Sequence, residues 1–232
     1  FGHPWLLQGG EKMSKSRGNV IYADDLAKLF GVDAVRYFVL HEMPFENDGT
    51  ITWELMVERT NAELANVLGN LVQRTISMGN KYFEGKVTNK NVSTDVDIQF
   101  IELINSLNTK VETKMDNYLV SDALTEIFNV LRASNKYIDD TMPWALAKDE
   151  TQLDRLETVL YNLLESIRVC ASMLEAFMPD TSASILTQIN NNDKTYAFNE
   201  NNSYKLGQPS ALFQRIDKDK LKGIYFVHNR KK

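Results

Sequence analysis

Apolar positions recur with the 3.6-residue period of amphipathic helices from Trp53 to about Ile189. The period predicts a helix over 53–83, a second over about 97–117 and a third capped by Ser121. It predicts a fourth helix that begins at the cap Thr151 and stops at Pro179, and a short fifth around 185–189. Amphipathic helices with short connections bury their apolar faces in an antiparallel bundle. The predicted fold class is therefore mainly α, an α-helical bundle.

The first 52 residues follow a different pattern. Residues 1–22 predict a strand, a glycine turn, a loop and a short extended piece over 19–22, and 44–52 predict turns with a small extended segment. Two short helices are predicted between them, with Asp24 or Asp25 and then Asp33 as candidate N-caps. The pattern thus separates 1–52 from the helical segment that follows.

The chain beyond the predicted helices has no period. Residues 190–214 are rich in Asn, Ser and Gly and predict a loop packed across the bundle, anchored by Tyr196, Phe198, Leu212 and Phe213. Residues 215–232 hold seven Lys or Arg against two Asp. That charge fits a solvated tail, a nonspecific RNA-binding arm or the start of a linker. The expected division is 1–52, a helical domain over 53–217 and a basic tail over 218–232.

A loop suited to phosphate lies within the first segment. Residues 12–16 spell Lys-Met-Ser-Lys-Ser, flanked by Gly9, Gly10 and Gly18. Lys is a compact charge that binds phosphate well, and Ser hydroxyls both donate and accept hydrogen bonds. Glycines let the backbone approach a ligand or move. The pattern indicates a mobile phosphate loop, although an ordinary charged loop has similar residues.

The first long predicted helix carries a polar ridge opposite its apolar face. At about 100° per residue, Asn66, Asn70 and Arg74 share one ridge because they are spaced by four. Solvation alone would account for this ridge. The alternative is base recognition, because an asparagine amide can match the edge of an unstacked base and arginine can add hydrogen bonds or stack.

A second candidate for base contact is the dipeptide Pro143-Trp144. Proline fixes the backbone just before the indole. The tryptophan could close the end of the bundle, or it could be a platform on which an unpaired base stacks. Trp5 and Trp53 lack this context and are predicted to be core residues.

Composition limits the other possibilities. The net charge is −5, so any nucleic-acid contact must be local. The single cysteine, Cys170, has apolar neighbours and is predicted to be an inert core thiol. The histidines are scattered, and no metal-ligand spacing, Ser/His/Asp set, membrane span or signal peptide is recognisable.

Residues 1–20, with Lys12, Met13, Ser14, Lys15 and Ser16 at their centre, resemble the signature loop of class I aminoacyl-tRNA synthetases. The runs 31–40, 44–45 and 48–49 are similar to the methionyl-tRNA synthetase branch, and so are 59–74 and 142–148. The resemblance covers about 1–217. It implies that residues 1–52 are the C-terminal end of a Rossmann-type catalytic domain with a connecting segment.

The resemblance also implies an activity and a set of site residues. The family activates methionine with ATP and Mg²⁺ and transfers it to tRNA(Met) in the cytoplasm. Lys15, assisted by Lys12, would stabilise the ATP phosphates within the loop 12–16. The implied contacts to the anticodon come from Asn66, Asn70, Arg74, Pro143 and Trp144. No metal site is expected in this segment.

Other parts of such an enzyme are not recognisable in the sequence. Gly2-His3 is not a His-x-Gly-His nucleotide signature, and Pro4 replaces the glycine that the family has after this histidine. The chain begins without an initiator Met inside an apolar run, as a piece of a longer protein would. We therefore expect the isolated chain to be inactive. The alternatives are a tRNA-binding helical module without catalysis and a helical scaffold that binds protein.

Overall fold

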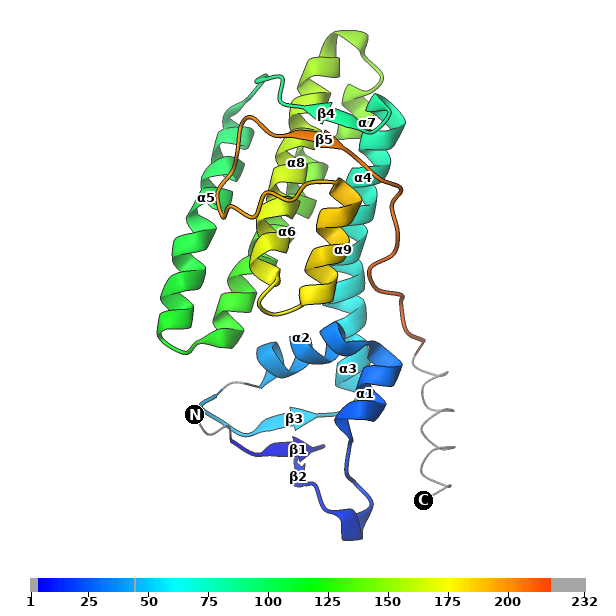
Figure 1. The fold of residues 1–232 in the computed structure, drawn as a ribbon, viewed down its shortest axis with the longest axis vertical. Coiled ribbons are helices and arrows are strands. Elements are labelled where there is room, and N and C mark those ends of the chain that lie inside the picture. Colours follow the sequence, from blue (N-terminus) through cyan, green and yellow to red (C-terminus); the bar gives the residue numbers. More distant parts are fainter. Residues whose placement is uncertain (1–3, 44, 218–232) are drawn as a thin grey trace.

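The computed structural model describes residues 4–43 and 45–217, in which long helices stand on a small sheet (Figure 1). The bundle consists of α5 (Asp95–Asp116), α6 (Val120–Thr141), α8 (Leu153–Leu174), α9 (Pro179–Ile189) and one long helix made of α3 (Trp53–Arg59), η2 (Thr60–Gly69) and α4 (Asn70–Phe83). Short turns join them, including α7 (Pro143–Leu146) and the 3₁₀ turn η3 (Glu150–Gln152). The predicted mainly α bundle is confirmed.

The N-terminal unit is a three-stranded sheet with two helices. Its elements are β1 (Leu6–Gln8), β2 (Glu11–Lys12), the 3₁₀ turn η1 (Lys15–Arg17), α1 (Ala23–Phe30), α2 (Val32–Glu42) and β3 (Gly49–Ile51). The strand order is β2-β1-β3, with β1 antiparallel to β2 and parallel to β3. A parallel pair needs a long crossover, which α1 and α2 supply here. The extended piece expected over 19–22 forms no strand.

A second, two-stranded sheet was not expected from the pattern. It pairs β4 (Lys86–Thr88) with β5 (Ser203–Lys205), so the segment after α9 returns across the bundle (Figure 1). Phe198, Leu212 and Phe213 pack against the core as predicted. Tyr196 does not, because it is 47% exposed. Tyr204, in β5, is buried and anchors the returning segment, although the sequence pattern did not predict it.

None of the predicted helix N-caps is found. α1 begins at Ala23 with Tyr22 as its N-cap, so Asp24 and Asp25 lie inside its first turn. α6 begins one residue before Ser121, whose hydroxyl instead donates to the carbonyl of His41. Asp149, not Thr151, accepts the capping hydrogen bond at the start of η3. Pro179 begins α9 rather than ending the fourth helix, because proline is tolerated in a first helical turn. Helix propensity alone does not distinguish these alternatives.

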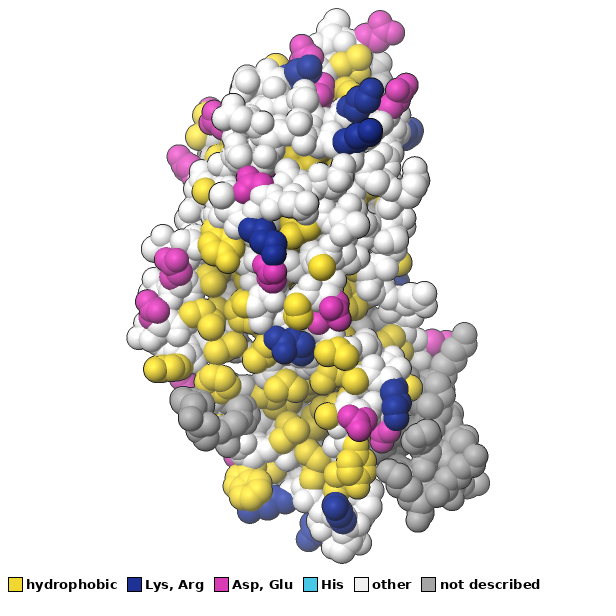
Figure 2. Space-filling model, in the orientation of Figure 1, with side chains coloured by type: hydrophobic (Ala, Val, Ile, Leu, Met, Phe, Trp, Pro, Cys, Tyr) yellow, Lys and Arg dark blue, Asp and Glu magenta, His cyan; other side chains and the backbone are white. Residues whose placement is uncertain are grey.

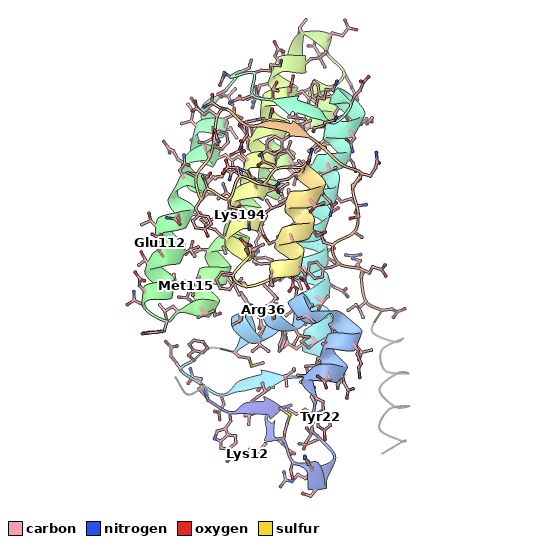
Figure 3. The ribbon with its side chains drawn as sticks, viewed as in Figure 1. Lys12, Tyr22, Arg36, Glu112, Met115 and Lys194 are labelled. Atoms are coloured by element: carbon pink, nitrogen blue, oxygen red, sulfur yellow. The ribbon has the colours of Figure 1, made fainter. Side chains whose placement is uncertain are left out.

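Asp33 was predicted to cap its own helix, but it binds the first turn of α9. Its Oδ2 accepts from the backbone N–H and the hydroxyl of Thr181, at 2.6 and 2.7 Å. One helical turn further along α2, Arg36 donates to the carbonyls of Ala176 and Phe177, just beyond α8, at 3.0 and 2.7 Å. A carboxylate thus faces a helix N-terminus and a guanidinium faces carbonyls beyond a C-terminus, as the helix dipoles favour. Figure 3 shows Arg36 on α2, where the sheet unit meets the bundle.

The centre of the bundle is α8, which is buried on all sides from Leu156 to Leu174. Its polar side chains are paired. Arg168 and Glu165 are fully buried, with Nη2 and Oε2 2.8 Å apart, and Asn162 donates to Asp97 at 3.1 Å. Cys170 is buried as predicted, and burial raises the pKa of its thiol to about 12.

We expect Asp33→Ala to lower the free energy of unfolding by about 2 kcal/mol, because two donors on α9 lose their buried acceptor. Urea unfolding of the chain measures the change. The matched control is Asp180→Ala, which removes an exposed carboxylate from the first turn of the same helix and should cost well under about 1 kcal/mol. Equal losses in the two variants would contradict the assigned role of Asp33.

Asp97 makes a pH-dependent contribution to stability. Burial raises the pKa of its carboxyl, but hydrogen bonds from Tyr137 and Thr94 and the charge of Arg155 outweigh this and hold the pKa below the usual 3.8. The stability that ionised Asp97 supplies is therefore present at neutral pH and lost as the pH falls through its lowered folded-state pKa. Urea unfolding from about pH 6 to about pH 3 should show a steeper loss for the wild type than for Asp97→Asn. Parallel curves would exclude this contribution.

Candidate nucleotide loop and nucleic-acid interface

The Lys-Met-Ser-Lys-Ser loop follows a glycine hairpin at the sheet end of the molecule, where Figure 3 labels Lys12. Gly9 and Gly10 link β1 to β2 with φ of 56° and 88°, and Gly18 ends the 3₁₀ turn η1 with φ of 67°. Only glycine adopts such angles without steric cost. Lys12 ends β2 and Lys15 begins η1, and both side chains are exposed.

Hydrogen bonds within the loop fix its shape. Asn19 Oδ1 accepts from the Ser14 N–H at 2.8 Å, and Asn19 Nδ2 donates to the Lys12 carbonyl at 3.2 Å. The hydroxyls of Ser14 and Ser16 lie 2.8 Å apart. Met13 is half-buried, packs against the core and accepts from the Ile21 N–H at 3.4 Å. The loop is therefore anchored by Met13 and closed by Asn19, a role that the sequence analysis did not assign.

Trp5 is not a core residue, contrary to the prediction. Its side chain is 64% exposed, and the Nζ of Lys12 lies 4.8 Å from its ring centroid, within reach of a cation–π interaction. Trp5 lies immediately before β1, the central strand, and its backbone N–H donates to Asp48 Oδ1 at 2.9 Å. Trp53, in contrast, packs against the core and stacks on Phe30, so that prediction is correct.

The polar ridge faces outward on the long helix. Asn66 and Asn70 are exposed and Arg74 is half-exposed, while the opposite face is buried. The predicted uniform turn of 100° per residue is wrong over η2, which is a π-helix: the Asn70 N–H bonds the carbonyl of Ala65, five residues back. Such widened helical turns are rare in proteins, and those that occur are often found at functional sites.

The segment 206–217, here called the C-terminal strap, runs along this ridge. Arg215 donates from Nε and Nη2 to Asn66 Oδ1 at 3.2 and 2.8 Å. Next to it, the side-chain amide of Asn61 exchanges two hydrogen bonds with the backbone of Ile216, at 2.9 and 2.8 Å. Arg215 is the first of the basic residues counted over 215–232, and its contact with Asn66 is not predicted from the sequence because the two residues are 149 positions apart.

Between the helix and the strap lies a hollow of about 380 Å³. Its lining combines two amides of the ridge with further polar and apolar groups: Ala65, Asn66, Gly69, Asn70, Gln73, Ala211, Leu212, Phe213 and Arg215. Amides, a guanidinium and an aromatic ring are the groups that recognise an unpaired base by its edge and by its face. Their grouping makes this surface chemically suited to single-stranded RNA.

Trp144 lies apart from the hollow, on α7. Pro143 is buried, whereas Trp144 is 43% exposed and so does not close the bundle as a core plug would. Along the long axis of Figure 1, α7 lies at the end far from the sheet, on the same level as the C-terminal part of α4. The predicted site residues thus lie in three places: the loop 12–16 at the sheet end, the ridge along the long helix, and Pro143-Trp144 at the opposite end of the bundle.

On the face that Figure 2 shows, Lys and Arg are mixed with Asp and Glu over most of the surface, although a few Lys and Arg side chains lie next to one another near the upper right. Apolar side chains gather over the lower half. Counterion release from many phosphates needs clustered cations. On this face, the distribution agrees with a recognition that depends on a few placed groups.

Some predictions concern residues outside the described ranges, namely His3, Pro44 and the basic tail 218–232. Within 4–43 and 45–217, no group of three His, Cys, Asp or Glu side chains could hold a metal ion. The helices in the same ranges include none that is both long and apolar enough to cross a bilayer.

Comparison with known families places the chain in two steps. The family model described as "tRNA synthetases class I (M)" matches residues 1–76, so the sheet unit and its loop are of the class I aminoacyl-tRNA synthetase type. The family model described as "Anticodon binding domain of methionyl tRNA ligase" matches residues 77–224, most of the bundle and the strap. The chain belongs to the methionyl-tRNA synthetase family.

Curated relatives and solved structures agree with this. The methionine–tRNA ligases of Caldanaerobacter subterraneus subsp. tengcongensis and Clostridium acetobutylicum are each 43% identical to the chain over 95% of its length. The chain spans about 35% of the length of these relatives. Mycobacterium tuberculosis methionyl-tRNA synthetase in complex with methionyl-adenylate superimposes with a TM-score of 0.86 at 36% identity, covering 93% of this chain and 44% of that one.

Proposed function

We propose that this chain is the part of a methionine–tRNA ligase that supplies the nucleotide loop and the anticodon-reading surface. In the complete enzyme the carboxylate of methionine attacks the α-phosphorus of ATP, so that methionyl-adenylate forms and pyrophosphate leaves. The adenylate then esterifies the 3′ end of tRNA(Met). The observation that carries the proposal is the match of adjoining residues, 1–76 and 77–224, to the two family models.

Lys15 and Lys12 act on the first step by stabilising negative charge on the phosphates of ATP. The support is that both ammonium groups are exposed on a loop with glycines on either side and hydroxyls at Ser14 and Ser16. Such a loop donates hydrogen bonds to phosphate oxygens without needing a proton transfer, so its contribution is electrostatic. Mg²⁺ accompanies ATP as a substrate ion, and no residue of this segment is proposed as its ligand.

Asn66, Asn70, Arg74 and Trp144 contact the anticodon of tRNA(Met), and Pro143, which is buried, fixes the backbone just before the indole. The amide of Asn70 and the Nδ2 of Asn66, whose Oδ1 accepts from Arg215, read base edges. Arg74 adds hydrogen bonds or stacks, and the exposed indole of Trp144 stacks on an unpaired base. In this proposal residues 1–52 end the catalytic domain and 53–217 form the anticodon-binding domain of a cytoplasmic enzyme. The isolated chain is inactive, because the remaining nucleotide and methionine sites lie elsewhere in the enzyme.

The catalytic part is tested with Lys15→Ala in the complete enzyme. We expect the kcat of ATP–pyrophosphate exchange to fall by about 100-fold or more, because a charge that stabilises the transition state is lost, while tRNA affinity stays nearly unchanged. Lys28→Ala, which removes an exposed lysine from α1 of the same unit, is the control and should leave kcat unchanged. An unchanged rate for Lys15→Ala would favour a tRNA-binding helical module without catalysis.

The binding part is tested with Trp144→Ala. We expect a loss of about 1–3 kcal/mol in affinity for tRNA(Met), since one stacked base loses its platform. Tyr196→Ala, which truncates another exposed aromatic ring, should leave the affinity unchanged. Competition between anticodon stem-loops then tests specificity: a wild-type enzyme that does not prefer the methionine anticodon CAU would favour a protein-binding scaffold.

A further inference from the structure

The turn between α6 and α7 depends on one residue in an unusual conformation. Met142 has φ of 45° and ψ of 63°, in the left-handed region that side chains other than glycine seldom occupy. It lies directly before Pro143, and its own side chain is 49% exposed. A methionine on the surface has no packing reason to accept this steric cost, so the turn itself requires the conformation.

The hydrogen bonds explain why the turn requires it. The Met142 N–H donates to the carbonyl of Ile138 at 3.0 Å and completes α6, while its carbonyl accepts from Ala145 at 2.8 Å and begins α7. One residue therefore ends one helix and starts the next. A residue before proline is also disfavoured in the right-handed helical region, so α6 cannot simply continue through Met142.

The direction of Trp144 follows from this joint. Pro143 is buried and its ring fixes φ, which leaves the backbone of Met142 as the point where the chain changes direction before the indole. We propose that Met142 is a positioning residue whose left-handed backbone presents Trp144 to an unpaired nucleobase of the tRNA. The inference rests on the proposed function, because it takes Trp144 to be the stacking platform.

The test compares four substitutions at Met142 in the complete enzyme. Glycine and asparagine tolerate a left-handed backbone, alanine tolerates it less well and β-branched valine least. We expect the KM for tRNA in aminoacylation to stay within about twofold for Met142→Gly, Met142→Asn and Met142→Ala, because none of them adds steric cost to that of the wild-type methionine, and to rise about tenfold for Met142→Val. ATP–pyrophosphate exchange without tRNA should be unchanged in all four.

A matched control separates positioning from general destabilisation. Asn190 ends α9 with φ of 51° and ψ of 47°, a similar left-handed cap far from Trp144 in sequence. Asn190→Val should lower the melting temperature about as much as Met142→Val but leave the KM for tRNA unchanged. If Met142→Val does not fold, Met142→Ala and Met142→Gly still test the proposal, because both remove the methionine side chain without adding steric cost, and a raised KM for tRNA in either would overturn it.

The outcomes distinguish this inference from the proposed function. If Trp144→Ala leaves the KM for tRNA unchanged, the proposed anticodon role of Trp144 fails. If Trp144→Ala raises the KM but the Met142 variants do not follow the order of left-handed tolerance, the positioning inference alone is overturned. A Met142→Gly variant as impaired as Met142→Val would show that the methionine side chain matters instead of the backbone. In the Trp144→Ala background, Met142→Val should add little to the KM.

Discussion

The position of the sheet unit against the helical bundle depends on one interaction, the attachment of α2 to the corner between α8 and α9. Asp33 binds the first turn of α9, and Arg36, one turn along the same helix, binds the carbonyls just after α8. The two charges match the opposite ends of the two helix dipoles, so α2 fits this corner in one orientation. Since α1 and α2 form the crossover between β1 and β3, the same contact fixes the sheet and the Lys-Met-Ser-Lys-Ser loop relative to the bundle.

A second constraint is the way the chain after α9 is held. Arg168 is buried in α8 and donates to the carbonyls of Thr195 and Ala197 at 2.8 and 2.6 Å, and its charge is matched by Glu165. A buried guanidinium must satisfy its donors, and the returning segment supplies acceptors for them. With that segment fixed, the C-terminal strap lies along the long helix and Arg215 reaches Asn66. The contacts of buried Arg168 therefore position the strap, and the strap forms one wall of the hollow beside the amide ridge.

The loop and the amide ridge, two of the places that carry proposed site residues, differ in how they are held. The loop at 12–16 is attached mainly through Met13 and the hydrogen bonds of Asn19, and its glycines permit movement. The amide ridge belongs to a helix whose opposite face is fully packed, which suits recognition of a fixed shape. These different attachments agree with the proposed roles, a loop that follows a changing phosphate and a surface that distinguishes bases.

The sequence by itself determined the helical period, the Lys-Met-Ser-Lys-Ser loop and the outward ridge of Asn66, Asn70 and Arg74, because each depends on residues near one another in the chain. Only the tertiary structure decided the partners of Asp33, the exposure of Trp5 and the pairing of β4 with β5. An aspartate can cap the helix that contains it or the N-terminus of another helix. The sequence therefore could not show that Asp33 binds the helix of Thr181, 148 residues away, instead of capping α2. The same holds for Arg215 and Asn66: a contact between distant segments depends on how the whole chain packs, which no local pattern contains.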